Sequence, residues 1–270
     1  MQKRKYILSL ITIFTFWNVG ISMTQKNLSG EEIVKESQQA FYYAGKDMQA
    51  KVLMKLISKN GNERIRELTM LRLNDNNNDK QKYYMYFHQP ADVRAMTFMV
   101  WKYTGKADDR WLYIPAIKLV KRIVADDKNS SFVGSDFSYE DVSGRDISDD
   151  IHTLKKEEKI NSRNAFVVES VPKQASGAYF SRKVSWIDKE TFLPLKEEYY
   201  DKRGDLYKTF TADKIENIQE IPTIMKRTML DTQNGHRTEV SFTKVKYNVG
   251  LRDNLFSERY LRNPPREWIR

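Results

Sequence analysis

Apolar and polar residues alternate along most of the chain with the two-residue period of β-strands. About a dozen segments carry this pattern and are rich in Val, Ile, Phe, Tyr, Trp and Thr, which strands favour. Turn sequences such as Asn60-Gly61 and Asn234-Gly235 separate several of them and favour tight hairpins. The pattern predicts strands at 48–59, 63–73, 81–88, 96–103, 110–114, 119–124, 153–160, 165–171, 179–187, 193–200, 207–218, 223–230 and 238–247.

Consecutive hairpins without long helical crossovers predict an antiparallel meander. About a dozen strands is more than a flat open sheet usually holds, so the sheet should curl. The alternation changes phase within 64–72 and within 239–247, as β-bulges in a curved sheet would cause. We therefore predict a mainly β (α+β) fold, in which a single strongly curved antiparallel sheet forms an unclosed β-barrel with helices over its concave face.

Two helices are predicted beside the strands. Ser29 and Glu32 have the spacing of a capping box, and the apolar residues that follow fall roughly on one helical face. This pattern predicts an amphipathic helix at 30–43, which we place over the concave side of the sheet. Near the C-terminus, a short helix is expected within 254–261, with its apolar residues inward: Leu255, Phe256, Tyr260 and Leu261.

Two of the predicted strands are apolar on both faces, at 83–87 and at 98–101. Strands of this kind are covered on both sides. We therefore expect a second layer outside the sheet in addition to the helix inside it.

The first residues have the order of a secretory signal peptide. A basic segment at 1–6 precedes an apolar run at 7–17, and small or polar residues follow. The apolar run is shorter than the roughly 20 residues that span a bilayer, although an uncleaved N-terminal anchor is an alternative. We predict a signal peptide at 1–22, with cleavage between residues 20 and 25, and one domain at 23–270.

The chain contains no cysteine, which excludes disulfides, thiolate metal sites and a lipid-modified cysteine. Together with the signal peptide, this predicts a periplasmic protein without a lipid anchor. The formal net charge of +10 favours transient contact with an anionic membrane surface or an acidic partner. Basic and acidic residues are interleaved throughout, which argues against nucleic acid as the partner.

The sequence offers no catalytic constellation and no cofactor motif. The three histidines, His88, His152 and His236, lack the spacing of metal ligands. There is no phosphate-binding glycine loop and no nucleophile elbow. We therefore predict no catalytic residues, no metal and no cofactor.

The acidic segment at 134–141 is the most concentrated polar feature. Asp136, Glu140 and Asp141 are of the type that binds a hard cation, but their spacing is not that of an EF-hand. The interpretation we favour is structural. Ser135 or Asp136 caps a short helical turn, and the aromatic residues Phe137 and Tyr139 anchor a loop.

A second concentrated feature surrounds Pro115. Apolar and basic residues alternate imperfectly over 110–123. One interpretation is a basic, aromatic rim near a cavity mouth. The other, which the sequence favours, is a hairpin with a solvated basic face.

The segments at 109–123 and 131–141, which contain these two features, resemble the signature of the outer-membrane lipoprotein-sorting protein family, the LolA-like branch of periplasmic proteins. The resemblance extends more loosely over the mature chain, including 87–92, 186–188 and 254–257. It implies an unclosed antiparallel barrel with helices that lid a hydrophobic cavity, and it brings no catalytic residues. The residues that carry it are Trp111, Tyr113, Pro115, Arg122, Gly134, Ser135, Asp136, Phe137, Tyr139 and Asp141.

In the well-understood members of this fold, the cavity accepts lipoprotein acyl chains. Burial of each CH₂ contributes about 0.8 kcal/mol, and methionine suits an adaptable apolar lining. Each candidate lining residue fits an ordinary core position equally well. The candidates are Met96, Phe98, Val100, Met225 and Met229.

Three function classes follow. The leading hypothesis is a monomeric, non-enzymatic periplasmic carrier of lipid or lipoprotein acyl chains. The alternative is an interaction protein without cargo, either an accessory to an inner-membrane exporter of the RND or ABC type or a sensor that binds a membrane regulator. The third is an enzyme that acts on lipids or envelope polymers, for which the sequence supplies no motif.

Overall fold

The strands form one antiparallel sheet of 13 strands in the computed structural model, which describes residues 27–75, 80–174 and 177–270. The predicted signal peptide lies outside the described residues. The strands are β1 (Asp47–Ile57), β2 (Glu63–Asn74), β3 (Lys80–Gln89), β4 (Thr97–Tyr103), β5 (Asp109–Ile114), β6 (Leu119–Ile123), β7 (Asp150–Ile160), β8 (Arg163–Pro172), β9 (Arg182–Asp188), β10 (Pro194–Tyr200), β11 (Leu206–Ile218), β12 (Ile221–Asp231) and β13 (Arg237–Tyr247).

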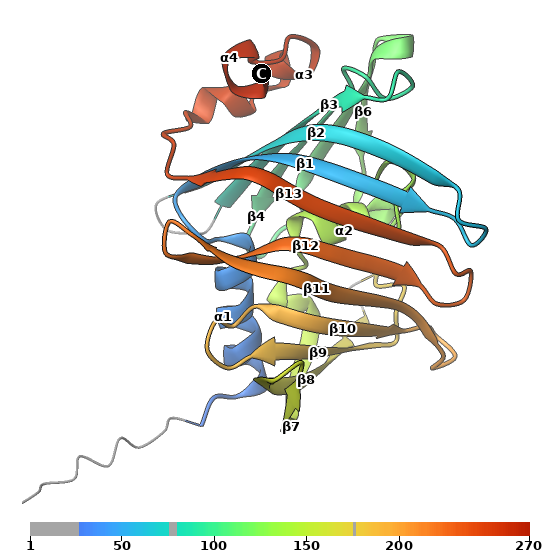
Figure 1. Cartoon of the computed structure of the whole chain (residues 1–270), viewed down its shortest axis with the longest axis vertical. Coiled ribbons are helices and arrows are strands. Elements are labelled where there is room, and N and C mark those ends of the chain that lie inside the picture. The colour runs from blue at the N-terminus through green and yellow to red at the C-terminus, as the bar shows by residue number, and fades with distance from the viewer. Residues whose placement is uncertain (1–26, 76–79, 175–176) are drawn as a thin grey trace, which may run out of the picture.

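The strand order explains why the barrel stays open. Two meanders, β1–β6 and β7–β13, lie side by side and are joined where β1 pairs with β13. The two edges of the sheet, β6 and β7, are consecutive in sequence but not paired. The chain between them, residues 124–149, folds into the interior of the curve (Figure 1). The predicted unclosed antiparallel sheet is confirmed, and every predicted strand is present.

Both predicted phase changes correspond to register shifts. The pairing of β2 with β3 shifts between Glu67 and Leu68. The pairing of β1 with β13 shifts between Gln49 and Lys51, opposite Lys244, whose φ is +51°. An extra residue on one strand bends it and increases its twist, so these bulges curve the sheet.

The concave face of the sheet carries the main apolar cluster. Leu68, Met70, Tyr83, Met85 and Phe87 alternate along β2 and β3 and point into it. Strand alternation sends the intervening residues to the convex face, where a second cluster forms. It contains Leu71, Tyr84, Met99 and Trp111 together with residues from the C-terminal segment.

The C-terminal segment supplies the outer layer that the two-sided strands predict. It comprises the 3₁₀ turn η6 (Asp253–Phe256), α3 (Glu258–Arg262) and α4 (Arg266–Ile269), at the top of Figure 1. The expected helix at 254–261 is divided, because Ser257 has an extended backbone with ψ of 155°. Its apolar residues cover the convex face of the sheet, and Phe256 and Leu261 are completely buried there.

Asp47 fixes the start of this outer segment. Its buried carboxylate accepts hydrogen bonds from the backbone amides of Val249, Gly250 and Leu251, at 2.7, 2.9 and 3.0 Å. Backbone amides in a buried turn require such acceptors. Asp47 therefore directs the chain from the end of β13 onto the convex face.

The N-terminal helix α1 (Gly30–Tyr42) begins with the predicted capping box between Ser29 and Glu32. Its N-terminus rests on β7 at Gly30, where a Cβ atom would lie only 2.8 Å from the backbone of His152. The helix also contacts β8 and β12, so it crosses one side of the barrel opening. Within the described ranges, no helix is both long and apolar enough to cross a membrane.

Candidate ligand cavity

A lid made from two parts of the chain covers the concave face. We define the lid as α1 together with residues 124–149, which contain η2 (Ala125–Asp127), η3 (Phe132–Gly134), α2 (Tyr139–Ser143) and η4 (Ile147–Asp149). Figure 1 shows α2 behind β12 and β13, inside the curve of the sheet. Two hydrogen bonds tie the parts together, from Gln38 Nε2 to the Arg145 carbonyl at 2.7 Å and from Tyr42 Oη to the Asp141 carbonyl at 3.3 Å.

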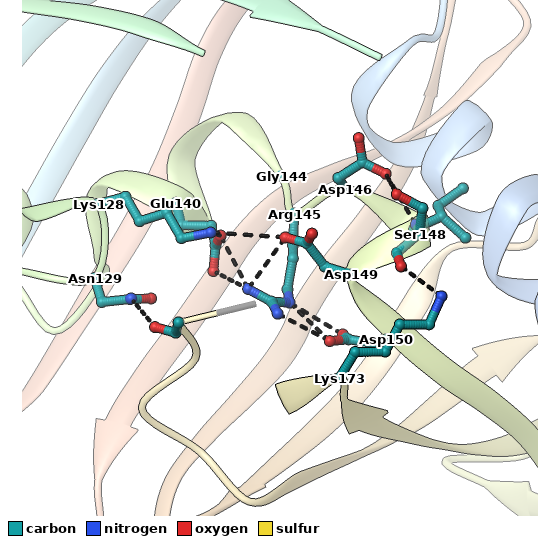
Figure 2. A network of polar contacts seen from close by, with 12 residues as sticks. Lys128, Asn129, Glu140, Gly144, Arg145, Asp146, Ser148, Asp149, Asp150 and Lys173 are labelled. Atoms are coloured by element: carbon teal, nitrogen blue, oxygen red, sulfur yellow. Dashed lines mark hydrogen bonds and ion pairs between the residues drawn. The ribbon is translucent and has the colours of Figure 1, made fainter. Parts of the chain in front are cut away.

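An ion-pair network holds the second part of the lid in shape (Figure 2). Arg145 lies at its centre, with Nε 3.0 Å from the Asp150 carboxylate and Nη1 3.1 Å from that of Glu140. Lys128 also contacts Glu140, at 2.9 Å, and Asp149, at 3.6 Å. Because Lys128 lies near the start of residues 124–149 and Asp150 begins β7, the network ties both ends of this segment together at the sheet edge.

The short helix α2 has a different cap from the predicted one. Ser138, not Ser135 or Asp136, is the N-cap, and it forms a capping box with Asp141. Asp136 instead accepts a hydrogen bond from Thr238 Oγ1 at 2.6 Å and contacts His236 Nδ1 at 2.9 Å, both on or beside β13. The sequence suggested Asp136 as a cap of α2, but its side chain binds β13 instead.

The loop around this helix is anchored as predicted, since Phe137 and Tyr139 are buried in the concave cluster. Ser135 is also buried, and its hydroxyl donates to the Phe137 carbonyl at 3.3 Å. Gly134 adopts φ of +76°, a backbone conformation that glycine tolerates. These motif residues shape the lid.

The acidic residues of this segment point to different partners. Glu140 meets Lys128 and Arg145, whereas Asp141 meets Lys208 Nζ at 2.9 Å. Burial raises the pKa of Asp141, but Lys208 and the Ser138 amide lower it, and the net pKa lies below its ordinary value. In the part of the chain that the structure describes, no three acidic or histidine side chains form a group that could hold a metal ion.

Two adjoining apolar cavities lie between the lid and the sheet, with volumes of about 50 and 30 Å³. Both are bounded by Met70, Val142, Arg227 and Phe242, so they meet at these residues. The first extends along α1 past Phe41, and the second extends toward the lid aromatics. This volume holds only a few water-sized groups, so the closed lid leaves little apolar space between itself and the sheet.

A larger polar cavity of about 340 Å³ opens between the lid segment and β4–β5. Its wall mixes cations and carboxylates, including Lys102, Arg110, Asp108 and Glu140. Arg110 Nη2 contacts Asp108 at 2.6 Å, and Lys102 Nζ donates to the Gly144 carbonyl at 2.7 Å. These charges are internally paired, so this cavity forms a polar end to the apolar interior.

The predicted cavity residues belong to or pack against the concave cluster, but they do not line the two apolar cavities. Phe98, Val100 and Met229 are almost completely buried, and Met96 and Met225 pack against the same cluster. None of the five borders the two apolar cavities. Their contact with cargo therefore stays a prediction that depends on movement of the lid.

Sequence reasoning missed Arg227, which borders both apolar cavities. A signal was present. Arg227 is two residues from Met229 in a predicted strand, and such residues share one face. Because Met229 was predicted to be buried, the same alternation predicts that the Arg227 side chain also points to the interior face of the sheet.

The motif residues of the β5–β6 hairpin lie away from the cavities. Trp111 packs edge-to-face on Trp101 in the convex cluster, and Tyr113 lies under Arg262 of α3. Arg122 is exposed and pairs with Asp109 at the open end of the hairpin, whereas the 3₁₀ turn η1 (Pro115–Ile117) forms its tip. The structure thus favours the hairpin with a solvated basic face over an aromatic cavity rim.

His152 links the end of the lid to β7 and β8. Its ring lies between Ser170 Oγ, 2.8 Å from Nδ1, and the Ile147 carbonyl, 3.0 Å from Nε2. Burial lowers the pKa of His152 from its ordinary value of 6.5, and burial together with Lys51 also lowers the pKa of His88.

Stability should therefore fall on mild acidification. Below about pH 6.5 the unfolded chain binds protons at these histidines while the folded chain does not, so the lost stability grows until the folded pKa values are reached. The slope reaches at most about 1.4 kcal/mol per pH unit for each group. Urea unfolding between about pH 7.5 and 5.5 measures it, and His152→Gln should reduce the slope. An unchanged slope in that variant would contradict the assignment.

An open antiparallel barrel with a two-part lid over an apolar interior defines a class of cavity-forming β proteins. A family model described as "Uncharacterized protein" matches residues 79–263. A search of the curated proteins gave no match. Among solved structures, a putative outer-membrane lipoprotein-sorting protein domain from Vibrio parahaemolyticus is 32% identical, with a TM-score of 0.79, covering 86% of this chain and 98% of that one.

Two further structures are similar. A DUF1329 family protein from Desulfovibrio piger is 28% identical, with a TM-score of 0.80, covering 86% of this chain and 97% of that one. A LolA superfamily protein from Nitrosomonas europaea, 18% identical, shares the fold with a TM-score of 0.67, covering 87% of this chain and all of that one. The chain belongs to the LolA-like outer-membrane lipoprotein-sorting family.

Proposed function

We propose that the protein is a monomeric, non-enzymatic carrier of the periplasm that binds lipid or lipoprotein acyl chains between the concave face of the sheet and the lid. The observation that carries this proposal is the pair of apolar cavities that share Met70, Val142 and Phe242 in their walls. An acyl chain requires a dry apolar wall and little directional bonding, because burial of CH₂ groups supplies its binding energy. Family membership and the signal-like N-terminus support the assignment.

Binding of a long chain requires the lid to move. The closed cavities hold only a few water-sized groups, whereas the concave cluster behind them extends over most of the sheet. The lid segment meets the sheet partly through polar contacts, such as Lys208 with Asp141 and Thr238 with Asp136. Water can replace such contacts when the lid lifts, so opening exposes the apolar wall to the cargo. Met96, Phe98 and Met229 then become candidate cargo contacts.

The first experiment is native mass spectrometry beside organic extraction. The protein is expressed with residues 1–270 in a Gram-negative host and purified from the periplasm. A discrete added mass that extracts as lipid is the expected result. A clean apo mass that persists after incubation with envelope lipids and an acylated peptide would overturn the carrier proposal. That outcome would favour the role of an accessory or sensor that binds a membrane protein.

A further inference from the structure

Arg227 is a partly buried cation in the wall of the apolar interior. It lies on β12, opposite Val240 of β13, and it borders both apolar cavities. Its Nε atom is buried and has no hydrogen-bond partner. Among the described residues, no carboxylate forms an ion pair with Arg227, and its guanidinium makes no hydrogen bond.

Three phenylalanine rings take the place of a counter-ion. The guanidinium carbon lies 5.4 Å from the ring centre of Phe41, 5.2 Å from that of Phe137 and 5.2 Å from that of Phe242. Cation–π contacts of this kind recover only part of the cost of removing a charge from water. Burial lowers the pKa of Arg227, but a guanidinium still keeps its proton at neutral pH.

The surroundings of Arg227 have too many donors and too few acceptors. Arg72 Nε and Tyr83 Oη, both in the wall of the larger apolar cavity, are also buried without a hydrogen-bond partner. Arg72 uses another nitrogen to bind the Ala44 carbonyl. Among the described residues, neither apolar cavity has an aspartate or glutamate in its wall. Buried donors are normally satisfied, so these groups are available to an acceptor that enters the cavity.

We propose that Arg227 binds the oxyanion group, a carboxylate or a phosphate, of an amphiphile whose hydrocarbon chain lies along the concave apolar wall. This inference rests on the proposed carrier function and specifies the cargo class. An oxyanion accepts hydrogen bonds from a guanidinium in a bidentate manner, and Arg72 and Tyr83 add donors on the same side.

The site also couples the cargo to the lid. Phe41 belongs to α1 and Phe137 to the lid segment, whereas Arg227 and Phe242 belong to the sheet. Both lid rings therefore rest on the cation while the lid is closed. An oxyanion that binds the guanidinium displaces these two rings and so loosens the lid. Binding of the head group and entry of the hydrocarbon chain therefore occur together.

The test compares amphiphiles that differ only in the head group. Isothermal titration calorimetry with the delipidated protein, produced with residues 1–270, uses dodecanoate, dodecyl phosphate and dodecan-1-ol. We expect at least one of the two anionic amphiphiles to bind about tenfold or more tightly than the alcohol, because a hydrogen bond to a charged group contributes that much to the affinity. The stronger of the two identifies the oxyanion. Inorganic phosphate alone should bind much more weakly than dodecyl phosphate, and equal affinity would overturn the amphiphile assignment.

Arg227→Met should abolish the preference for the anion and keep the affinity for the alcohol. Because the variant removes a partly buried charge that has no ion-pair partner among the described residues, its melting temperature should stay the same or rise. Arg182→Met is the matched control. Arg182 also stacks on a ring, that of Tyr200 at 3.4 Å, but it lies outside the cavities and pairs with Glu169, so the preference should remain.

The outcomes separate the two proposals. If the wild-type protein binds the alcohol and the anions equally, the carrier function stands and the role of Arg227 is overturned. If it binds none of the amphiphiles, both proposals fail. If Arg227→Met retains the preference for the anion, the oxyanion site lies elsewhere.

Discussion

Replacing Arg145 with alanine should lower the free energy of unfolding by about 3–5 kcal/mol, the cost of removing one partner from a buried ion pair. The side chains of Glu140 and Asp150 are only 9% and 4% exposed. Lys128 still contacts Glu140 in the variant, but Arg145 is the cation in contact with Asp150. Among the described residues, Asp150 would therefore keep a buried charge with no cation in direct contact, at the point where the lid joins β7.

Urea unfolding measures this effect, with Arg203→Ala as the control. Arg203 also contacts two carboxylates, Asp201 and Asp205, but its side chain is 74% exposed. Exposed ion pairs contribute little, so the control should unfold like the wild type. A loss of less than about 1 kcal/mol in Arg145→Ala would mean that water reaches Asp150 and screens it.

Replacing Phe256 with alanine should also cost about 3–5 kcal/mol, the usual range for a buried phenylalanine. The ring is completely buried between the C-terminal segment and the convex face, in a cluster with Leu71, Tyr84 and Met99. The Phe256 carbonyl also accepts a hydrogen bond from Trp101 Nε1 at 2.7 Å. Loss of the ring leaves a void and loosens the layer that covers this face.

Thermal unfolding and binding of an apolar dye report the two consequences. The melting temperature should fall and dye fluorescence should rise, because the convex apolar cluster becomes accessible. Ile117→Ala is the control, since its side chain is 65% exposed at the hairpin tip and its loss should change neither reading. Unchanged stability in Phe256→Ala would indicate that the C-terminal segment is not a structural layer.

Most strands were predictable because at least one face is buried and the side-chain period fixes which residues occupy it. The same periodicity exposed the bulges near Leu68 and Lys244 and the two-sided strands at 83–87 and 98–101. It also predicted a layer outside the sheet. It did not identify that layer as the C-terminal segment, because the contact between Asp47 and Val249 joins residues about 200 positions apart.

The candidate site was less predictable than the fold. The methionine and phenylalanine pattern led to residues of the correct face, such as Phe98 and Met229, but not to those at the cavity wall. Which residues of a buried face border a cavity depends on how the lid seats against them. The N-cap of α2 could not be predicted for the same reason. Asp136 binds Thr238 of β13, and Ser138 is the N-cap instead.

The sequence by itself determined the elements of this protein, because local periodicity and turn residues act within a few positions of the chain. The number of strands indicated a curved, unclosed sheet, and the motifs at 109–123 and 131–141 carried the resemblance to the family. Only the tertiary structure decided which residues line the interior and which charges are paired there. Lys208 pairs with Asp141 and Arg145 pairs with Asp150, whereas Arg227 contacts aromatic rings. Pairing of buried charges depends on distances between side chains from different strands and helices, which the order of residues along the chain does not specify.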